Sequence, residues 1–464
     1  MKELFDFEFE KKRIIKSNDK KEILKSLLDE DFNYHRKKSG NGIHGLHAFP
    51  AKFPPQLPEI FIEYLTEPGQ TVLDPMMGSG TTILEAIGKN RNSIGCDLDP
   101  LSILIVKVKT QSYNKRELIE CGNRVLQDSY HLFHDKKDEI ENIYDSKFSD
   151  KSKKFIEYWF APQTIYELTS LLYSIEQINN EKIRNFLKVV FSSTIITKTG
   201  GVSLALDLAH TRPHKAKKVL NSNNKLLYEN NLDRYTEKRQ KILTKKIRSA
   251  FELFKHNLKE NVYAVFDQLP GNAVIQHADS QNLPISNEKV NLIVTSPPYA
   301  STAIDYMRAH KFSLIWLGFE MDDLSKIRGE YIGGESVSGF SFSELPAQVQ
   351  KKIIELQKID SKKSRALHRY FTEMSKVLSE MYRVLENNSV AIVVVGNSNL
   401  KGINTELQKC LPEIGNEVGF EVPAIWMRNL DRNKRMMPVG TKINNLSQIE
   451  KRMHIEYVIS FYKQ

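Results

Sequence analysis

The sequence predicts an α/β protein with one doubly wound, mostly parallel sheet that is interrupted by a long, largely helical insertion. Short apolar runs bounded by turn residues fall into an early cluster, 71–97, and a late cluster, 273–395. In the early cluster a strand, a glycine-rich loop, a helix and a second strand follow one another within about 30 residues, which is a βαβ unit. The roughly 170 residues between the clusters are predicted to be mostly helical, with charged faces.

The early elements follow from apolar spacing and turn residues. Residues 1–45 are polar and basic, with helical periodicity near Ile14–Leu28, and we expect an N-terminal helical extension there. Apolar residues at helical spacing from Leu57 to Leu65 end at Pro68-Gly69, a turn signal. Strands are expected at Thr71–Asp74 and Ser93–Asp97, with a helix between them that begins near Thr81.

The late elements resume the alternation of strand and helix. Strands are expected at Ala273–Gln276, at Val290–Val294 and, after a helix from about Arg369 to Glu386, at Val390–Val395. His454–Tyr462 is expected to be a final edge strand. The sheet domain therefore spans 46–110 and 271–464, and the inserted region spans 111–270.

The composition favours a globular enzyme of the cytoplasm. Of the 464 residues, 40% are apolar and 27% are charged, and no apolar run approaches the roughly 18 residues of a membrane span. The first residues lack the basic-then-apolar layout of a signal peptide. Three widely spaced cysteines, Cys96, Cys121 and Cys410, suit neither a disulfide framework nor a zinc site. We therefore expect no contact with a membrane.

Basic residues are concentrated in one part of the inserted region. The formal net charge is +10, and residues 212–260 hold 14 lysines and arginines against 5 aspartates and glutamates. Such a cluster fits a polyanionic partner, because basic side chains displace counterions from phosphates. It fits a solvated, lysine-rich helix face equally well, so the charge leaves both interpretations open.

A glycine-rich loop lies between the first strand and its helix, where open sheets bind nucleotide-like ligands: Asp74-Pro75-Met76-Met77-Gly78-Ser79-Gly80-Thr81-Thr82. Glycines let the backbone approach a ligand, and the helix amino terminus offers free N–H groups. No lysine follows as in a phosphate-binding loop, and Ile83 replaces the third glycine of a dinucleotide fingerprint. Asp97, at the end of the second strand, suits a carboxylate that accepts ribose hydroxyls. Each feature alone is common in proteins; together they predict an adenosine-containing ligand without phosphates to hold.

The tetrapeptide Ser296-Pro297-Pro298-Tyr299 follows an apolar strand, at the edge where open sheets place active sites. Its prolines fix φ and remove two backbone donors, so the nearby carbonyls stay free to accept N–H groups. The Ser296 oxygen and the Pro297 carbonyl suit an amino group, and Tyr299 suits stacking on a flipped base. Alone, these residues would indicate a rigid turn; beside the glycine loop and Asp97 they favour methyl transfer to an amino nitrogen.

These motifs resemble those of the amino-methyltransferases that modify DNA, which carry an FxGxG-type loop and a [D/N/S]PP[Y/F] tetrapeptide. The resemblance covers about 47–110 and 273–400. It implies a Rossmann-like class I methyltransferase fold, S-adenosylmethionine as cofactor, and double-stranded DNA as partner, with the target base flipped out of the duplex. The TSPPY form is similar to the cytosine-N4 branch, and adenine N6 is the alternative target.

The resemblance also implies roles for single residues. Ser296, Pro297, Pro298 and Tyr299 would be catalytic. Phe53, within His47–Pro54, would line the methionine end of the cofactor, and Asp279 would bind its adenine amino group. The other cofactor-binding residues would be Asp74, Pro75, Met76, Gly78, Ser79, Gly80, Thr81 and Asp97, with Met76 where the family usually has phenylalanine. Two stretches after the tetrapeptide, Ala303–Tyr306 and Arg308–Lys311, are expected to buttress the site.

The sequence lacks the features that three alternative functions would require. Methylation at cytosine carbon 5 needs a thiolate, normally in a Pro-Cys pair, and none of the three cysteines follows a proline. A metal at His210 and His214 is disfavoured, because Pro213 interrupts the helix that would place both on one face. A non-catalytic DNA-binding subunit would be expected to have a damaged cofactor loop or tetrapeptide, and both are intact.

We expect the modification enzyme of a restriction–modification or related defence system, with a cognate restriction endonuclease as a further partner. Target recognition is expected within 111–270, because that region holds the basic cluster. A polar segment after the tetrapeptide, 320–365, is the second candidate for this role.

Overall fold

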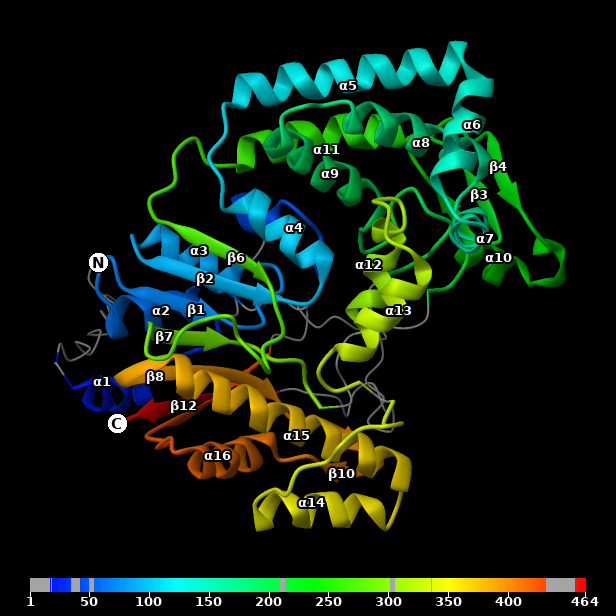
Figure 1. Ribbon diagram of the computed structural model, residues 1–464. Helices are drawn as coiled ribbons and strands as arrows, with labels where there is room; N and C mark the ends of the chain where they lie inside the picture. Colours follow the sequence, from blue (N-terminus) through cyan, green and yellow to red (C-terminus); the bar gives the residue numbers. More distant parts are fainter. Residues whose placement is uncertain are drawn as a thin grey trace, which may run out of the picture.

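The computed structural model describes residues 17, 19–34, 42–49, 54–208, 213–300, 305–334, 336–430 and 455–464. At its centre is a seven-stranded sheet in the order β11-β12-β8-β7-β1-β2-β6 (Figure 1). Neighbouring strands from β6 to β8 pair in parallel, whereas β12 is antiparallel to both β8 and β11. The strands are β1 (Thr71–Asp74), β2 (Asn92–Asp97), β6 (Ala273–His277), β7 (Val290–Thr295), β8 (Leu385–Gly396), β11 (Ile425–Asn429) and β12 (Ile455–Lys463). The expected doubly wound, mostly parallel α/β fold is confirmed.

Helices cover both faces of the sheet, because successive strand residues point to opposite sides. On β1, Val72 packs in the core of one face and the next residue, Leu73, packs in the core of the other. The first face is covered by α1 (Lys20–Ser26), α2 (Gln56–Leu65), α3 (Thr81–Gly88) and α4 (Pro100–Lys109). The second face is covered by α14 (Ala347–Gln357), α15 (Ser361–Val384) and α16 (Leu407–Val418), with a hairpin of β9 (Asn399–Leu400) and β10 (Ile403–Asn404) before α16.

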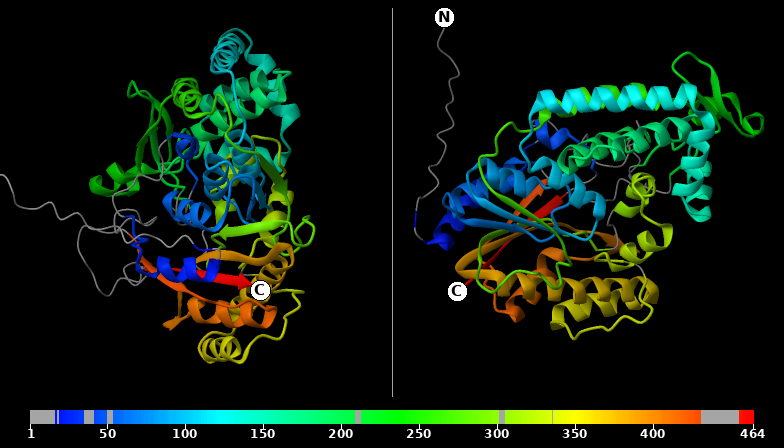
Figure 2. Two further views of the ribbon diagram at one scale, coloured as in Figure 1. Left: turned by 90° about the vertical axis from the view of Figure 1, so that its left-hand side faces the viewer. Right: turned by 45° about the horizontal axis from the view of Figure 1, so that its top comes forward.

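The inserted region is mostly helical and carries a small sheet of its own (Figure 2). Its helices are α5 (Lys115–Asp135), α6 (Lys137–Lys147), α7 (Asp150–Trp159), α8 (Pro162–Glu176), α9 (Glu181–Ile195), α10 (Glu237–Leu243) and α11 (Ala250–Ala264). Three short strands, β3 (Lys218–Leu220), β4 (Leu226–Glu229) and β5 (Thr244–Lys246), pair in the order β4-β3-β5. Apolar alternation does not predict this sheet, because each strand is only 3 or 4 residues long and lysines lie in two of them.

The insertion shares a hydrophobic core with the segment that follows the tetrapeptide. That segment contains α12 (Tyr306–Leu314) and α13 (Met321–Glu330). Phe312 and Trp316 are fully buried, and Trp316 packs edge to face on Phe148 and Phe160 of the insertion, with ring centroids 5.3 and 5.5 Å apart. The insertion is therefore anchored directly beside the residues that follow β7. Within the described part of the chain, no helix has the length and apolar character needed to cross a membrane.

The two ends of the chain differ from the expectation. β12 is not an edge strand: it lies between β8 and β11 and is buried along most of its length, whereas β11 buries only alternate residues. The prediction was wrong because the short, half-exposed β11 gives little apolar signal. At the other end, α1 packs on the sheet, and Trp426 of β11 donates from Nε1 to the Leu27 carbonyl at 2.9 Å.

Candidate active site

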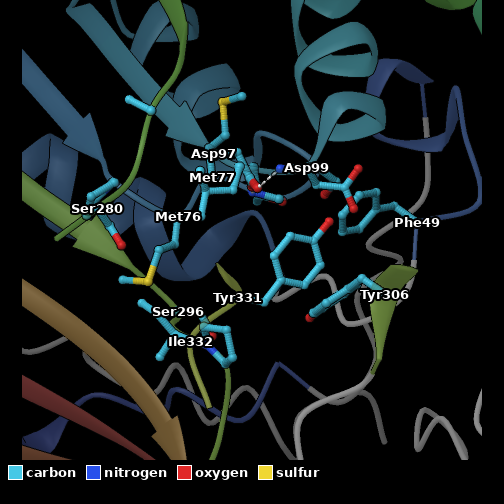
Figure 3. A pocket seen from close by; sticks show the side chains of 17 residues that line it. Phe49, Met76, Met77, Asp97, Asp99, Ser280, Ser296, Tyr306, Tyr331 and Ile332 are labelled. Atoms are coloured by element: carbon cyan, nitrogen blue, oxygen red, sulfur yellow. Dashed lines mark hydrogen bonds between the residues drawn. The ribbon is translucent and has the colours of Figure 1, made fainter. Parts of the chain in front are cut away.

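A cavity lies at the carboxyl ends of β1, β2 and β7 (Figure 3), with a volume of about 830 Å³ that includes its opening to solvent. β1 pairs with β2 on one side and with β7 on the other, which makes this the switch point where open sheets bind ligands. The lining includes eight of the residues expected from the sequence: Pro75, Met76, Gly78, Ser79, Thr81, Asp97, Ser296 and Pro298. The glycine loop and the tetrapeptide therefore meet at one cavity.

The glycine loop bends sharply over the start of α3. Gly78 and Gly80 have φ values of +48° and +78°, a region that is costly for residues with a side chain. A Cβ on Gly80 would lie 2.8 Å from Val106 of α4, so this glycine allows the loop to pack closely on the protein behind it. A Cβ on Gly78 would lie 3.4 Å from the ring of Phe49, which itself lines the cavity. The loop backbone is thereby exposed to a ligand on its cavity side.

Asp97, the last residue of β2, accepts three hydrogen bonds from its surroundings. Oδ2 accepts from the Gly78 N–H at 2.8 Å and from the Ser102 hydroxyl at 2.9 Å, and Oδ1 accepts from the Asp99 N–H at 2.9 Å. A carboxylate has about four acceptor positions, so the contacts within the described residues leave one, on Oδ1, for a ligand hydroxyl. Burial, and after it the charge of Asp99, raises the pKa of Asp97 to about 6.

Asp99 also lines the cavity, although its sequence context did not single it out, and it connects the cavity to α12. Its Oδ2 lies 2.5 Å from Nδ1 of the fully buried His310, and its Oδ1 caps α4 by accepting from the Leu101 N–H at 2.8 Å. Burial opposes the charge of Asp99, but His310 and the hydrogen bonds outweigh burial and lower its pKa. Figure 3 shows the Tyr331 hydroxyl directed toward this carboxylate. His310 belongs to the stretch 308–311 that was expected to support the site, and Asp99 is its partner there.

Asp74 lies behind the cavity lining and connects the two motifs. Its Oδ1 accepts from the Thr295 hydroxyl at 2.7 Å and from the Met76 N–H at 3.2 Å. Thr295 directly precedes the tetrapeptide, and one residue earlier the Val294 carbonyl accepts from the Thr82 hydroxyl at 3.0 Å. Burial raises the pKa of Asp74 to about 7. The end of β7 is thus fastened to the glycine loop by two buried side chains.

The tetrapeptide runs from the cavity toward the last strand of the sheet. Ser296 and Pro298 line the cavity, Pro297 is buried, and Tyr299 reaches β12, where its hydroxyl donates to Oε1 of Glu456 at 2.9 Å. Burial, and after it the charge of Glu456, raises the pKa of Tyr299 well above its ordinary value. The serine and the tyrosine of the motif therefore face different neighbours, and the tyrosine ring is held by a side chain that is distant in the sequence.

Two aromatic residues of the cavity wall, Phe49 and Tyr306, lie in segments that the resemblance singled out without assigning either residue to the cofactor site. The Phe49 ring lies 5.6 Å from Tyr306 and 5.0 Å from His310, and both Phe49 and Tyr306 line the cavity. Phe49 belongs to the segment His47–Pro54 that the resemblance singled out. The resemblance therefore pointed to the correct segment, but it named Phe53, whereas Phe49 is the phenylalanine found in the cavity lining. Phe53, like residues 303–304, lies outside the described residues.

Three predicted cofactor residues do not line the cavity: Asp74, which lies behind the lining as described above, Gly80 and Asp279. Gly80 packs behind the loop, as described above. Asp279 lies between two lining residues, Ala278 and Ser280, while its own Oδ1 accepts from the Gln281 N–H at 2.9 Å. A role for Asp279 in binding an adenine amino group therefore stays a prediction.

The histidine pair considered for a metal is only partly described. His214 lies 3.8 Å from Asp207, and His210 is outside the described residues. In the described part of the chain, no three His, Cys, Asp or Glu side chains gather as a metal site. No role for a metal ion is proposed.

A buried ion pair on α15 holds the segment that carries Tyr331. Arg369 Nε lies 2.7 Å from Oε1 of Glu373. The Arg369 guanidinium donates to the Gly329 carbonyl at 2.8 Å, and Glu373 Oε2 accepts from the Gly333 N–H at 2.7 Å. Tyr331 and its neighbour Ile332 both line the cavity. Part of the segment 320–365, the second candidate for target recognition, therefore belongs to the wall of the cofactor cavity.

The charges of the cavity suit a cationic ligand that has no phosphates. Its lining includes the carboxylates of Asp97 and Asp99 and, within the described residues, no lysine or arginine. The glycine loop and the start of α3 offer N–H groups for a carboxylate. S-Adenosylmethionine has a sulfonium, an ammonium, a ribose and a single carboxylate, so the residues present fit that cofactor.

Known proteins resemble this chain in sequence along most of its length. A family model for DNA methylases matches residues 3–108 and 290–464. The Type II methyltransferase M.MvaI of Kocuria varians is 23% identical over 439 residues, which cover 90% of each chain. M.MjaII of Methanocaldococcus jannaschii is 25% identical over 429 residues, covering 78% of this chain and 73% of that protein.

The chain was also compared with solved structures. A TehB-like SAM-dependent methyltransferase from Corynebacterium glutamicum aligns over 88% of this chain and 87% of that one, with 10% identity and a TM-score of 0.26. A SAM-dependent methyltransferase from Methanosarcina mazei aligns over 87% of this chain and 96% of that one, with 8% identity and a TM-score of 0.29. At these scores neither structure adds to the topology described above.

Proposed function

The chain belongs to the DNA methylase family and uses S-adenosylmethionine, and on that premise we propose that it methylates the N4 amino group of a cytosine in double-stranded DNA. The observation that carries this proposal is that Ser296 lines the same cavity as Asp97 and the glycine loop. S-Adenosylmethionine, when bound, supplies a methyl group activated by its sulfonium. A serine in the first position of the tetrapeptide resembles the cytosine-N4 branch, and adenine N6 is the alternative.

The cofactor would be held by residues from the carboxyl ends of two strands. The Asp97 carboxylate would accept a ribose hydroxyl on Oδ1, and the N–H groups of Ser79 and of the start of α3 would face the methionine carboxylate. Met76 and Phe49 supply apolar surface to the same cavity. Because Asp97 also accepts the Gly78 N–H, the ribose site and the loop form one unit.

Ser296 and Pro297 would orient the amino group of the target base. Two acceptors that hold both N–H bonds leave the nitrogen lone pair facing the cavity. Transfer of the cofactor's methyl group to the nitrogen would need no bond between enzyme and base, and the nitrogen would release one proton to solvent. Burial raises the pKa values of Cys96 and Cys410 to about 12, which keeps both as thiols and agrees with a reaction that needs no thiolate.

We assign DNA contact and target reading to the inserted region, 111–270. Lysines directly before β4, on α10 and at the end of β5 are exposed, and those at 225, 238, 241 and 246 form no ion pair with described residues. Figure 1 shows β3, β4 and α10 on the side of the molecule toward which β2 and β7 point. A duplex bound on that side would need to flip a base to bring its amino group to Ser296.

The biological setting that we propose is DNA modification in the cytoplasm as one half of a restriction–modification system. The similar proteins M.MvaI and M.MjaII are Type II methyltransferases, which supports this setting. A cognate endonuclease that recognises the same DNA sequence would then be the second component.

Transfer of a labelled methyl group from S-adenosylmethionine to DNA, followed by nucleoside chromatography, tests the proposal. We expect N4-methylcytosine from the unaltered chain. Ser296→Ala and Tyr299→Ala should each lower transfer by at least about 100-fold while leaving cofactor affinity within about twofold. Ser379→Ala, at an exposed position of α15 outside the cavity lining and outside the inserted region, is the control. N6-methyladenine as the product would overturn the cytosine assignment.

A further inference from the structure

A second buried charge pair lies beside the tetrapeptide, and the function proposed above does not use it. Arg428 ends the buried side of β11, and Glu456 lies opposite it on β12. Their side chains are only 6% and 12% exposed, and Arg428 Nε lies 3.2 Å from Glu456 Oε2. Glu456 Oε1 accepts the Tyr299 hydroxyl, so the pair is linked directly to the tetrapeptide.

The hydrogen bonding of this pair is incomplete. Among the described residues, Nε and Nη1 of Arg428 and Oε2 of Glu456 have no hydrogen-bond partner. Other buried arginines differ: Arg91 and Arg369 each donate to carbonyl or side-chain oxygens. Burying a guanidinium with unmet donors costs stability, and such a cost is common where a ligand supplies the missing acceptors.

The position of the pair fits a ligand that occupies the tetrapeptide. Glu456 lies opposite Gly396, at the carboxyl end of β8, and β8 is the neighbour of β7 on the side away from β1 and β2. The cofactor cavity is on the β1 and β2 side. An amino group held at Ser296 receives its methyl group from the cavity side, so the ring that carries it extends toward β8 and β12.

We propose that Arg428 belongs to the target-base pocket and donates hydrogen bonds to the ring acceptors next to the reacting amino group. This inference rests on the proposed function and makes it more specific. Cytosine presents two acceptors beside its amino group, N3 and O2, whereas adenine presents N1 and then a C–H group. A guanidinium offers several donors in one plane, so Arg428 selects cytosine. Glu456 holds both the guanidinium and Tyr299 in place.

The test compares binding to two duplexes that differ at one position. Once the methylated base of the unaltered chain is known, one duplex keeps that base and the other has an abasic site there. Arg428→Met and Arg428→Lys should lower affinity for the first duplex by at least about tenfold and single-turnover methylation by at least about 100-fold. Their affinity for the abasic duplex and for S-adenosylmethionine should stay within about twofold of the unaltered chain.

The controls separate base contact from a structural role. The double variant Arg428→Met with Glu456→Gln removes both buried charges, and its melting temperature should equal or exceed that of the unaltered chain. Arg91→Met, which removes a buried arginine whose donors have partners, should instead lower the melting temperature. An equal loss of affinity for both duplexes, or a parallel loss of cofactor binding in both Arg428 variants, would overturn the inference. If the product is N6-methyladenine, the cytosine proposal fails, while the abasic comparison still reports whether Arg428 contacts the base.

Discussion

At the scale of single residues, the ionisation of Asp97 sets a lower pH limit for cofactor binding. Burial raises its pKa to about 6, and only the charged form is the strong acceptor that a ribose hydroxyl needs. Below pH 6 the dissociation constant of S-adenosylmethionine should therefore rise, approaching tenfold per pH unit. Titration calorimetry from pH 5 to 8 measures this, with Asp97→Asn as the control whose affinity should lack this pH dependence. A flat profile for the unaltered chain would contradict the assignment.

The same carboxyl group affects the stability of the free protein with the opposite sign. A raised pKa means that the folded state favours the protonated form. The contribution of Asp97 to stability is thus complete below its ordinary pKa of 3.8 and is lost as the pH rises through about 6. The site gives up some stability at neutral pH in return for a charged acceptor at the ribose position.

Sequence motifs predicted the site residues whose role is local and missed those whose role depends on the fold. Gly78 and Asp97 are recognisable because a positive φ and a strand-end carboxylate leave a pattern in the chain. Asp99 carries no such pattern, and His310 was expected only as part of a supporting stretch, because their contact joins positions that only the packing of α12 on α4 brings together. Asp99 did have a weak signal: it precedes Pro100 as the N-cap of α4.

At the scale of elements, α15 holds one wall of the cavity through Arg369 and Glu373. Arg369→Lys keeps the charge but loses the fork that reaches the Gly329 carbonyl, so the segment with Tyr331 should loosen. We expect the KM for S-adenosylmethionine to rise about tenfold, with a smaller change in kcat, because ground-state binding is what the wall supports. Steady-state kinetics measure this split. Arg365→Lys, at an exposed position of the same helix, is the matched control, and an unchanged KM in the Arg369 variant would refute this role.

Elements were predictable where both faces of a strand are buried by helices. β1 matches its predicted bounds and β7 extends the predicted run by one residue, since a continuous apolar run bounded by turns has few other interpretations. β11 and the small sheet of the insertion were missed, because strands that bury alternate residues or lysines resemble loops. The order of the strands follows from pairings between distant segments, which local patterns do not contain.

At the scale of the whole molecule, the insertion brings a basic surface to the side of the molecule toward which β2 and β7 point (Figure 1). The helical core of the insertion is continuous with α12, and the small sheet packs against the insertion through a separate cluster that includes Ala161 and Val219. A first set of four exposed lysines lies on this surface: Lys225, Lys238, Lys241 and Lys246. A second set of four exposed lysines lies elsewhere, on α14, directly after it and on α15: Lys351, Lys358, Lys362 and Lys376. If the first set contacts DNA phosphates, changing all four to glutamine removes counterion release at those positions.

Changing the first set should therefore lower DNA affinity and reduce the slope of log affinity against log salt by about 0.9 for each phosphate that is no longer neutralised. Changing the second set should leave that slope as it is, because charge number is matched and only position differs. Cofactor affinity should be the same in both variants, since neither set includes residues of the cavity lining. Fluorescence anisotropy with a labelled duplex over a range of salt concentrations measures both slopes. Equal reductions in the two variants would mean that net charge alone, and not this surface of the insertion, determines DNA binding.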